Sequence, residues 1–259
     1  MNDRPQNYGR PWTREELILA FDLYCQIPFQ KTKASNQEVR DLASLLRRSP
    51  ASVARKLGNL GAFDPELKRR NISGLGHGSK LDREVWDEFH SDWNGLVLEA
   101  HKLRTAQYAE SGYDLATDLP EPPPGPSERT ALTHQRVHQS FFRAAVLSSY
   151  DSTCCVTGIR TPECLIASHI VPWGLDEKHR TDPTNGLCMS ATFDRLFDSG
   201  LMTVTAEFIA SFSGRILKSA DANTRDLLAV YEGRRILLPL RFRPSQDRLD
   251  WHRRYRFIA

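Results

Sequence analysis

The stretch Leu165-Ile-Ala-Ser-His-Ile-Val-Pro-Trp173 organises the C-terminal half of this chain. Its apolar start predicts a short β-strand that ends on a serine and a histidine, before a proline and a tryptophan turn the chain. After a loop of charged and turn residues, the sequence predicts a second short strand at 185–188 and a short helix at 190–200 that a glycine closes. The predicted order is therefore strand, loop, strand, helix, with two aspartates on the helix.

These two aspartates are candidate metal ligands. Asp194 and Asp198 are four residues apart, so both carboxylates can lie on one face of a helix. Oxygen ligands of this kind suit a hard divalent cation such as Mg²⁺ or Mn²⁺. His169 could face that cation and take a proton from water, because imidazole titrates near neutral pH. A metal ion and a general base together can cut a phosphodiester bond.

The segment resembles the HNH endonucleases of the restriction-enzyme type, whose fold is a ββα-metal finger. The resemblance rests on the joint spacing of several short motifs and covers roughly residues 130 to 259. The matching positions inside the finger are Gly158, Leu165, Ala167–Ile170, Pro172, Trp173, Asn185–Leu187, Asp194, Phe197, Asp198, Gly200 and Leu201. Those outside it are Arg136, Gln139, Phe142, Arg143, Tyr150, Cys155, Thr157, Leu249, His252, Arg253 and Phe257.

The resemblance implies a role for each matching polar residue of the finger. His169 matches the general base that activates water. Asn185 matches the asparagine that steadies the loop carrying the base, and it is a catalytic candidate in that sense. Asp194 matches a metal ligand that is His, Asn or Asp in different relatives. Asp198 matches a position that provides a further ligand in some of them.

Two features depart from the pattern of the family. Relatives often carry a metal-binding Asp or His directly before the base, where this chain has Ser168, a poor ligand that remains a candidate. Many relatives also hold a structural zinc with two Cys-x-x-Cys pairs, and this sequence contains no such pair, so we expect no structural zinc. We interpret the cysteines as reduced thiols of a cytoplasmic protein: Cys25, Cys154, Cys155, Cys164 and Cys188.

Each candidate also has a purely structural interpretation. His169 could be a hydrogen-bonded core histidine, and the two aspartates could form a solvated helix face beside Arg195. Arg143 and Arg195 could contact phosphate or could simply be solvated. Ser168 also leaves open an HNH fold that binds nucleic acid without cutting it.

The overall composition is that of a soluble globular protein. The chain has 259 residues, of which 40% are hydrophobic and 26% are charged. This length suggests one or two domains. The net charge of +3 and the pI of about 8.6 are compatible with nucleic-acid binding without establishing it. We expect no membrane span and no signal peptide, because the apolar runs are short and the first residues are polar.

Capping patterns predict helices in the N-terminal region. Thr13 and Glu16 form a capping box, and Ser49 caps a later helix with Pro50 at its first position. Another helix starts at 35–38, and a longer helical stretch covers 82–108. Apolar residues at helical spacing predict the buried stripes of the first three helices: Leu17, Ala20, Phe21, Tyr24, Val39, Leu42, Ala43, Leu46, Val53, Leu57 and Leu60.

The helices at 35–46 and 49–60 resemble a helix-turn-helix, with Arg47 and Arg48 in the turn. We expect the second of them to expose four polar residues of types that contact phosphates and base edges, namely Ser52, Arg55, Lys56 and Asn59. The alternative is an ordinary helical hairpin with a polar outer face. A fused nuclease favours the DNA-binding interpretation, since it needs a domain that selects its sites.

A proline-rich stretch, Asp118-Leu-Pro-Glu-Pro-Pro-Pro-Gly-Pro-Ser127, predicts a linker between two domains. The expected fold class is α+β. It comprises a helical DNA-reading domain at 1–116, a linker at 117–130 and an HNH nuclease domain at 131–259.

The resulting hypothesis is a metal-dependent endonuclease that cuts double-stranded DNA as a homodimer, with one active site per chain. A separate reader suggests restriction or defence, and modified DNA is one substrate that such a reader could select. Two alternatives stay open: a transcription regulator with a degenerate HNH fold, and a nuclease for RNA or structured nucleic acid.

Overall fold

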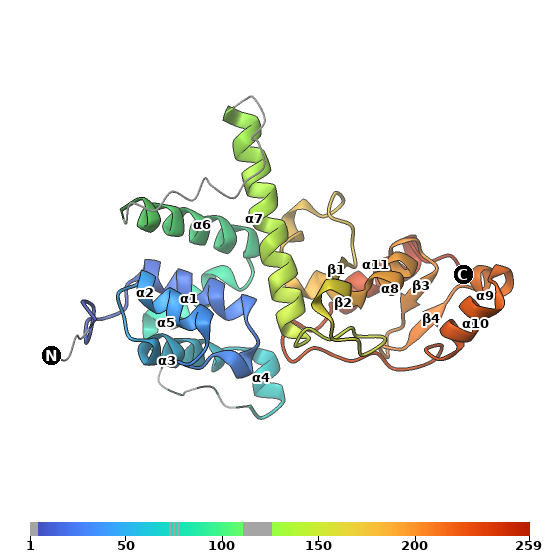
Figure 1. Ribbon diagram of the computed structural model, residues 1–259, viewed down its shortest axis with the longest axis horizontal. Helices are drawn as coiled ribbons and strands as arrows, with labels where there is room; N and C mark the ends of the chain where they lie inside the picture. The colour runs from blue at the N-terminus through green and yellow to red at the C-terminus, as the bar shows by residue number, and fades with distance from the viewer. Residues whose placement is uncertain (1–4, 73, 75, 77, 111–125) are drawn as a thin grey trace. The chain divides into compact units, whose positions relative to one another are not determined.

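The computed structural model describes residues 5–72, 74, 76, 78–110 and 126–259, with side chains from residue 133 in the last range. The chain divides into two compact units, residues 1–141 and 142–259. The first is helical, and the second combines helices with two antiparallel hairpins, so the α+β prediction is confirmed (Figure 1). Helix α7, Pro126–Ser149, contributes residues to both units.

Helix α7 begins inside the predicted linker. Residues 126–130 are its first turn, whereas the sequence predicted a linker up to residue 130. Proline is compatible with the first position of a helix, where no backbone N–H is needed, so Pro126 does not prevent the helix from starting there. The rest of the predicted linker, 117–125, lies outside the described residues. Across the described part of the chain, every helix is too short or too polar to cross a bilayer.

The N-terminal unit is built from helices (Figure 1), and the sequence encodes the caps of several of them. The predicted capping box of Thr13 and Glu16 is present, and the Ser49 side chain accepts from the backbone N–H of Ser52 with Pro50 next to it. Asn36 caps the second helix. The predicted stripes are all buried. The helices are α1 Arg14–Gln26, α2 Gln37–Leu45, α3 Pro50–Gly61, α4 Pro65–Arg69, α5 Lys80–Phe89 and α6 Trp93–Glu110.

The helical stretch predicted at 82–108 is two helices, α5 and α6. The Asp92 carboxylate accepts a hydrogen bond from the backbone N–H of Gly95 at 3.0 Å, as an N-cap does, and so begins a new helix after α5 has ended. Its aromatic residues pack in the core: the ring of Trp86 stacks on Phe21 of α1 at 4.8 Å.

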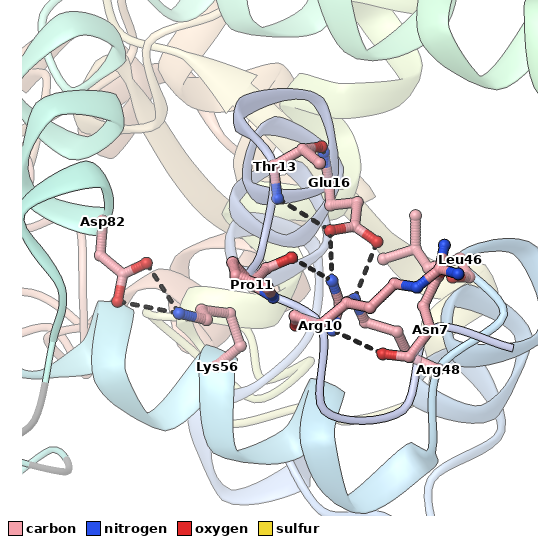
Figure 2. Close-up of polar contacts among 9 residues, drawn as sticks. All are labelled: Asn7, Arg10, Pro11, Thr13, Glu16, Leu46, Arg48, Lys56 and Asp82. Atoms are coloured by element: carbon pink, nitrogen blue, oxygen red, sulfur yellow. Dashed lines mark hydrogen bonds and ion pairs between the residues drawn. The ribbon is translucent and has the colours of Figure 1, made fainter. Parts of the chain in front are cut away.

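A buried arginine connects the α2–α3 turn to the start of α1, as Figure 2 shows. Arg48 is 6% exposed and donates to both carboxylate oxygens of Glu16, at 2.8 and 2.7 Å. It also donates to the backbone carbonyls of Asn7, Arg10 and Pro11. A buried charge is stable only when it is paired and hydrogen-bonded, and Arg48 meets both conditions.

The C-terminal unit contains the predicted strand–loop–strand–helix (Figure 1). Strand β1, Leu165–His169, pairs antiparallel with β2, Gly186–Ser190, in a register that sets His169 opposite Gly186. Helix α8, Ala191–Asp198, follows β2 directly and packs on the hairpin. A second antiparallel hairpin follows, formed by β3 Met202–Val204 and β4 Ala210–Phe212. The remaining helices are α9 Gly214–Ser219, α10 Ala222–Ala229 and α11 Gln246–Tyr255.

Gly186 lets α7 approach the first hairpin closely. A Cβ at this position would lie 2.2 Å from Cγ2 of Val146 and 3.0 Å from Cζ of Phe142, both on α7. Any larger residue would therefore push the hairpin away from the helix. This matters for the site, because Phe142 is the residue on which His169 rests.

Candidate active site

The end of β1 sends two neighbouring side chains in different directions. Consecutive residues of a strand point to opposite faces. The Ser168 side chain is hydrogen-bonded to the Asp194 carboxylate of α8, whereas the ring of His169 stacks on Phe142 of α7 with a centroid distance of 3.7 Å. Strand β1 thus ends on Ser168, which contacts the candidate metal ligand Asp194, and on His169, the candidate base.

The imidazole of His169 is held on three sides. Phe142 lies under it, Trp173 meets it edge-on at 5.5 Å, and its Nε2 is 3.0 Å from the backbone carbonyl of Arg180. Since a carbonyl can only accept, Nε2 of the neutral ring carries the proton and Nδ1 has the free lone pair. Burial lowers the pKa of His169, and the Arg180 carbonyl partly opposes that effect. The ring is therefore neutral at pH 7.

The loop between β1 and β2 that presents the Arg180 carbonyl, here called the Arg180 loop, is stabilised by contacts of its own. The guanidinium of Arg180 lies over the ring of Trp173 at 5.0 Å, and its Nε donates to the carbonyl of Glu177. Nδ1 of His179 lies 2.9 Å from the carboxylate of Asp176. No sequence pattern marks Arg180, because its contribution to the site is a backbone carbonyl and not its side chain.

Asn185 fixes the chain that follows His169. Its side-chain amide accepts from the backbone N–H of Val171 at 2.9 Å and donates to the carbonyl of the same residue at 3.0 Å. Its own carbonyl accepts from the N–H of Ile170. Asn185 is fully buried. An amide is needed here, because the site requires both a donor and an acceptor.

Asp194 is the half-buried carboxylate of the site, on α8. Burial raises its pKa, and repulsion from Asp198 raises it further. The hydrogen bond from Ser168 and the charge of Arg195 act in the opposite direction. A nearby positive charge stabilises the ionised form of a carboxylate in this environment, since that charge offsets the cost of burial.

The helical spacing suggested that Asp198 and Asp194 face the same cation, but the Asp198 side chain is paired with arginines instead. Its side chain is 53% exposed and pairs with Arg256, whose guanidinium is 3.2 Å away. Arg195 is 82% exposed and lies 3.9 Å from the other oxygen of Asp198. Arg143 donates to the backbone carbonyl of Leu165 at 2.9 Å and so contacts the start of β1.

The expected exposure of helix α3 is wrong for two of its four polar residues. Lys56 is 8% exposed and forms a buried ion pair with Asp82 of α5, at 2.8 and 3.0 Å (Figure 2). Asn59 is 6% exposed. Helix α3 packs against α1, α2 and α5, so less of its surface is free than an outer helix would have. Ser52 is half-buried, and Arg55 is exposed as predicted.

The ligand chemistry of the site fits a cation that is shared with a substrate. Within the described ranges, no three His, Cys, Asp or Glu side chains come together as a metal cluster. Mg²⁺ commonly uses one or two carboxylates and takes its other ligands from water and substrate phosphates. Asp194, with the hydroxyl of Ser168 beside it, matches that smaller requirement.

Comparison with known proteins identifies this part of the chain. Residues 154–205 match the family model described as HNH endonuclease. The matched range includes β1, the Arg180 loop, β2, α8 and β3. No curated protein matches the chain.

Proposed function

We propose that this protein is a metal-dependent DNA endonuclease with His169 as its general base, because residues 154–205 match the family model described as HNH endonuclease. The observation that carries the proposal is the environment of the His169 ring. Its Nε2 donates to the Arg180 carbonyl, which leaves Nδ1 with a lone pair, and burial keeps the ring neutral. A base of this kind must be unprotonated and correctly oriented before it can act.

In the proposed reaction, Nδ1 of His169 takes a proton from a water molecule. The water oxygen forms a new bond to phosphorus, the bond from phosphorus to the 3′ oxygen breaks, and the leaving oxygen takes a proton from solvent. The hydrogen bond to the Arg180 carbonyl persists and stabilises the imidazolium that forms. Asn185 keeps the loop in place throughout through its two bonds to Val171.

Asp194 is the proposed ligand of a divalent cation, Mg²⁺ or Mn²⁺, with Ser168 next to it. When bound, such a cation supplies positive charge beside the phosphate as negative charge accumulates on it. Asp198 stays a proposed further ligand, provided that it leaves Arg256. Arg195 and Arg143 are proposed phosphate contacts, and the high exposure of Arg195 supports the first of these.

We propose that the N-terminal unit selects the site on double-stranded DNA and that Arg55 is its principal contact on α3. The division of the chain into two compact units supports separate reading and cutting. Cutting both strands with one site per chain favours a homodimer. A role in restriction or defence against modified DNA extends the same proposal.

One observation favours a second candidate function, a DNA-binding regulator with an inactive HNH fold. The position before the proposed base holds Ser168, whose hydroxyl is a weaker metal ligand than a carboxylate. This candidate predicts DNA binding without cutting.

The test is a cleavage assay with unmodified plasmid and, in parallel, with modified phage DNA. Each substrate is incubated with Mg²⁺, with Mn²⁺ and with EDTA. We expect metal-dependent cutting, and we expect His169→Ala to reduce its rate by roughly 10²- to 10⁴-fold while DNA binding persists. His134→Ala, which alters an exposed histidine of α7, is the control and should cut normally. DNA binding by the wild-type protein without cutting in any condition would favour the regulator instead.

A further inference from the structure

The C-terminal end of helix α8 is held by a segment close to the end of the chain. This tail segment, His252–Ile258, contacts three backbone carbonyls at or just after the end of the helix. Nε2 of His252 lies 3.1 Å from the carbonyl of Phe197, and Nε of Arg256 donates to the carbonyl of Asp198 at 2.7 Å. The backbone N–H of Ile258 donates to the carbonyl of Gly200 at 2.9 Å.

His252 is the most buried member of the tail segment, at 1% exposure. Its ring lies flat on the ring of Phe197, with a centroid distance of 3.7 Å. Its Nδ1 is 3.0 Å from the hydroxyl of Thr203 on β3. Because the Phe197 carbonyl can only accept, Nε2 donates to it and Nδ1 accepts from the Thr203 hydroxyl. His252 therefore joins α8, β3 and α11 with one neutral ring.

Gly200 allows the tail segment to lie directly against the end of α8. Its backbone has a φ of +74°, and a Cβ there would lie 2.1 Å from the carbonyl oxygen of Arg256. Only glycine tolerates both the left-handed conformation and this contact. Arg256 also pairs with the Asp198 side chain, so the segment binds the last turn of α8 through backbone and side chain together.

We infer that the tail segment positions the Asp194 carboxylate by holding helix α8, and that His252 is its central positioning residue. Helix α8 has only eight residues, and a helix of that length depends on its packing for its structure and orientation. Asp194 lies one turn before the residues that the segment holds. The role of Asp194 as a cation ligand rests on the proposed function, whereas the support of α8 by His252 does not.

The experiment compares His252→Phe with His252→Gln in the full-length protein. Phenylalanine keeps a ring that can stack on Phe197 but has no donor for its carbonyl, whereas the amide of glutamine can replace Nε2–H. Leu249→Ala, which removes a fully buried side chain of the same helix, controls for a general loss of stability. Thr203→Val provides a milder second perturbation, because it removes only the hydrogen bond to Nδ1.

Two readouts are measured for each variant. The first is hydrogen exchange of the α8 amides, which requires no activity. The second is the Mn²⁺ concentration at half-maximal binding, followed by the loss of the free-Mn²⁺ resonance signal. We expect His252→Phe to speed exchange across α8 and to raise the Mn²⁺ midpoint by about 10-fold, a typical effect of losing support behind a ligand. His252→Gln should remain close to wild type in both readouts.

The outcomes separate this inference from the proposed function. Hydrogen exchange of α8 that is unchanged in both His252→Phe and Thr203→Val would overturn the inference. So would a Leu249→Ala variant that is as stable as His252→Phe and raises the Mn²⁺ midpoint by the same factor. If wild-type protein binds no Mn²⁺ and cuts no DNA, the proposed metal site fails. Even then, faster α8 exchange in His252→Phe, rescued by His252→Gln, would show that the segment supports the helix.

Discussion

At the scale of single residues, the protonation and the position of the candidate site residues depend on the groups that contact them. The Arg180 carbonyl determines which nitrogen of His169 carries the proton, and burial, to which the stacked ring of Phe142 contributes, lowers the pKa of the imidazole. Asn185 contributes no atom to the proposed reaction and instead fixes the backbone of Val171. The proposed role of His169 therefore depends on its contacts with Arg180, Phe142 and the loop that Asn185 holds.

Ser168 provides a direct test of the proposed cation site. Ser168→Asp would place a second carboxylate against Asp194, to which Ser168 is hydrogen-bonded. Without a cation, this added carboxylate and the half-buried carboxylate of Asp194 repel each other, so we expect a lower melting temperature. Mn²⁺ should restore that temperature and should support cutting at a lower concentration than in wild type. Thermal melts with and without Mn²⁺ measure the effect.

The matched control is Thr192→Asp, which adds the same charge at an exposed position of α8. It should show no stabilisation by Mn²⁺ beyond that of the wild-type protein. A Ser168→Asp variant that is insensitive to Mn²⁺ would count against a cation site at Asp194.

At the scale of elements, the first hairpin and α8 are supported from both ends of the unit. Gly186 admits α7 beneath β2, and Gly200 admits the tail segment against the end of α8. Each glycine lies where another part of the chain approaches at contact distance. The two-stranded sheet and short helix are too small to be stable alone, so these contacts supply much of their rigidity.

His252 should make the stability of this unit sensitive to acid. Burial lowers its pKa to about 4, and the charges of Arg256 and Arg253 act in the same direction, against the Phe197 carbonyl and Asp198. In the unfolded chain the pKa returns to about 6.5. Between these values the unfolded state binds more protons, so the free energy of unfolding falls as the pH decreases.

The expected size of this effect is about 3 kcal/mol, lost between roughly pH 6.5 and pH 4. His252→Gln, which cannot titrate, should flatten that part of the stability profile. Urea unfolding at a series of pH values measures it, with His134→Gln as a control that keeps the wild-type slope. An identical slope in His252→Gln and wild type would show that His252 is not responsible.

At the scale of the whole molecule, the two units hold polar groups of different kinds. The C-terminal unit contains the candidate site, whereas the N-terminal unit contains two buried ion pairs among its described residues, Arg48 with Glu16 and Lys56 with Asp82. A basic residue on α3 is therefore no evidence of a DNA contact unless it is also exposed. By that criterion Arg55 remains the DNA-reading candidate on α3 and Lys56 does not.

A pair of neighbouring substitutions separates these two roles. Arg55→Ala should weaken DNA binding and reduce the slope of its salt dependence by about 1, with a stability change within about 0.5 kcal/mol. Lys56→Met should instead lower the free energy of unfolding by about 3–5 kcal/mol, because it leaves Asp82 buried and unpaired. Binding titrations at several salt concentrations and urea unfolding measure the two quantities. Normal affinity and salt slope in Arg55→Ala would remove α3 from the proposed DNA surface.

Local spacing in the sequence was enough to predict several helix starts and the order of the elements that carry the candidate site. The caps of Thr13 and Ser49 and the strand–loop–strand–helix order depend on residues a few positions apart, so the linear pattern contains them. The predicted buried stripes follow from helical periodicity for the same reason.

The roles of several polar side chains depended on partners that only the folded chain brings together. Lys56 meets Asp82 across 26 residues, His252 meets the carbonyl of Phe197 across 55, and Arg256 meets Asp198 across 58. A polar residue on a helix is equally compatible with solvent, with an ion pair or with a ligand, and helical spacing does not distinguish among them. Tertiary packing decides, because it determines which opposite charge or carbonyl lies within hydrogen-bonding distance of each side chain.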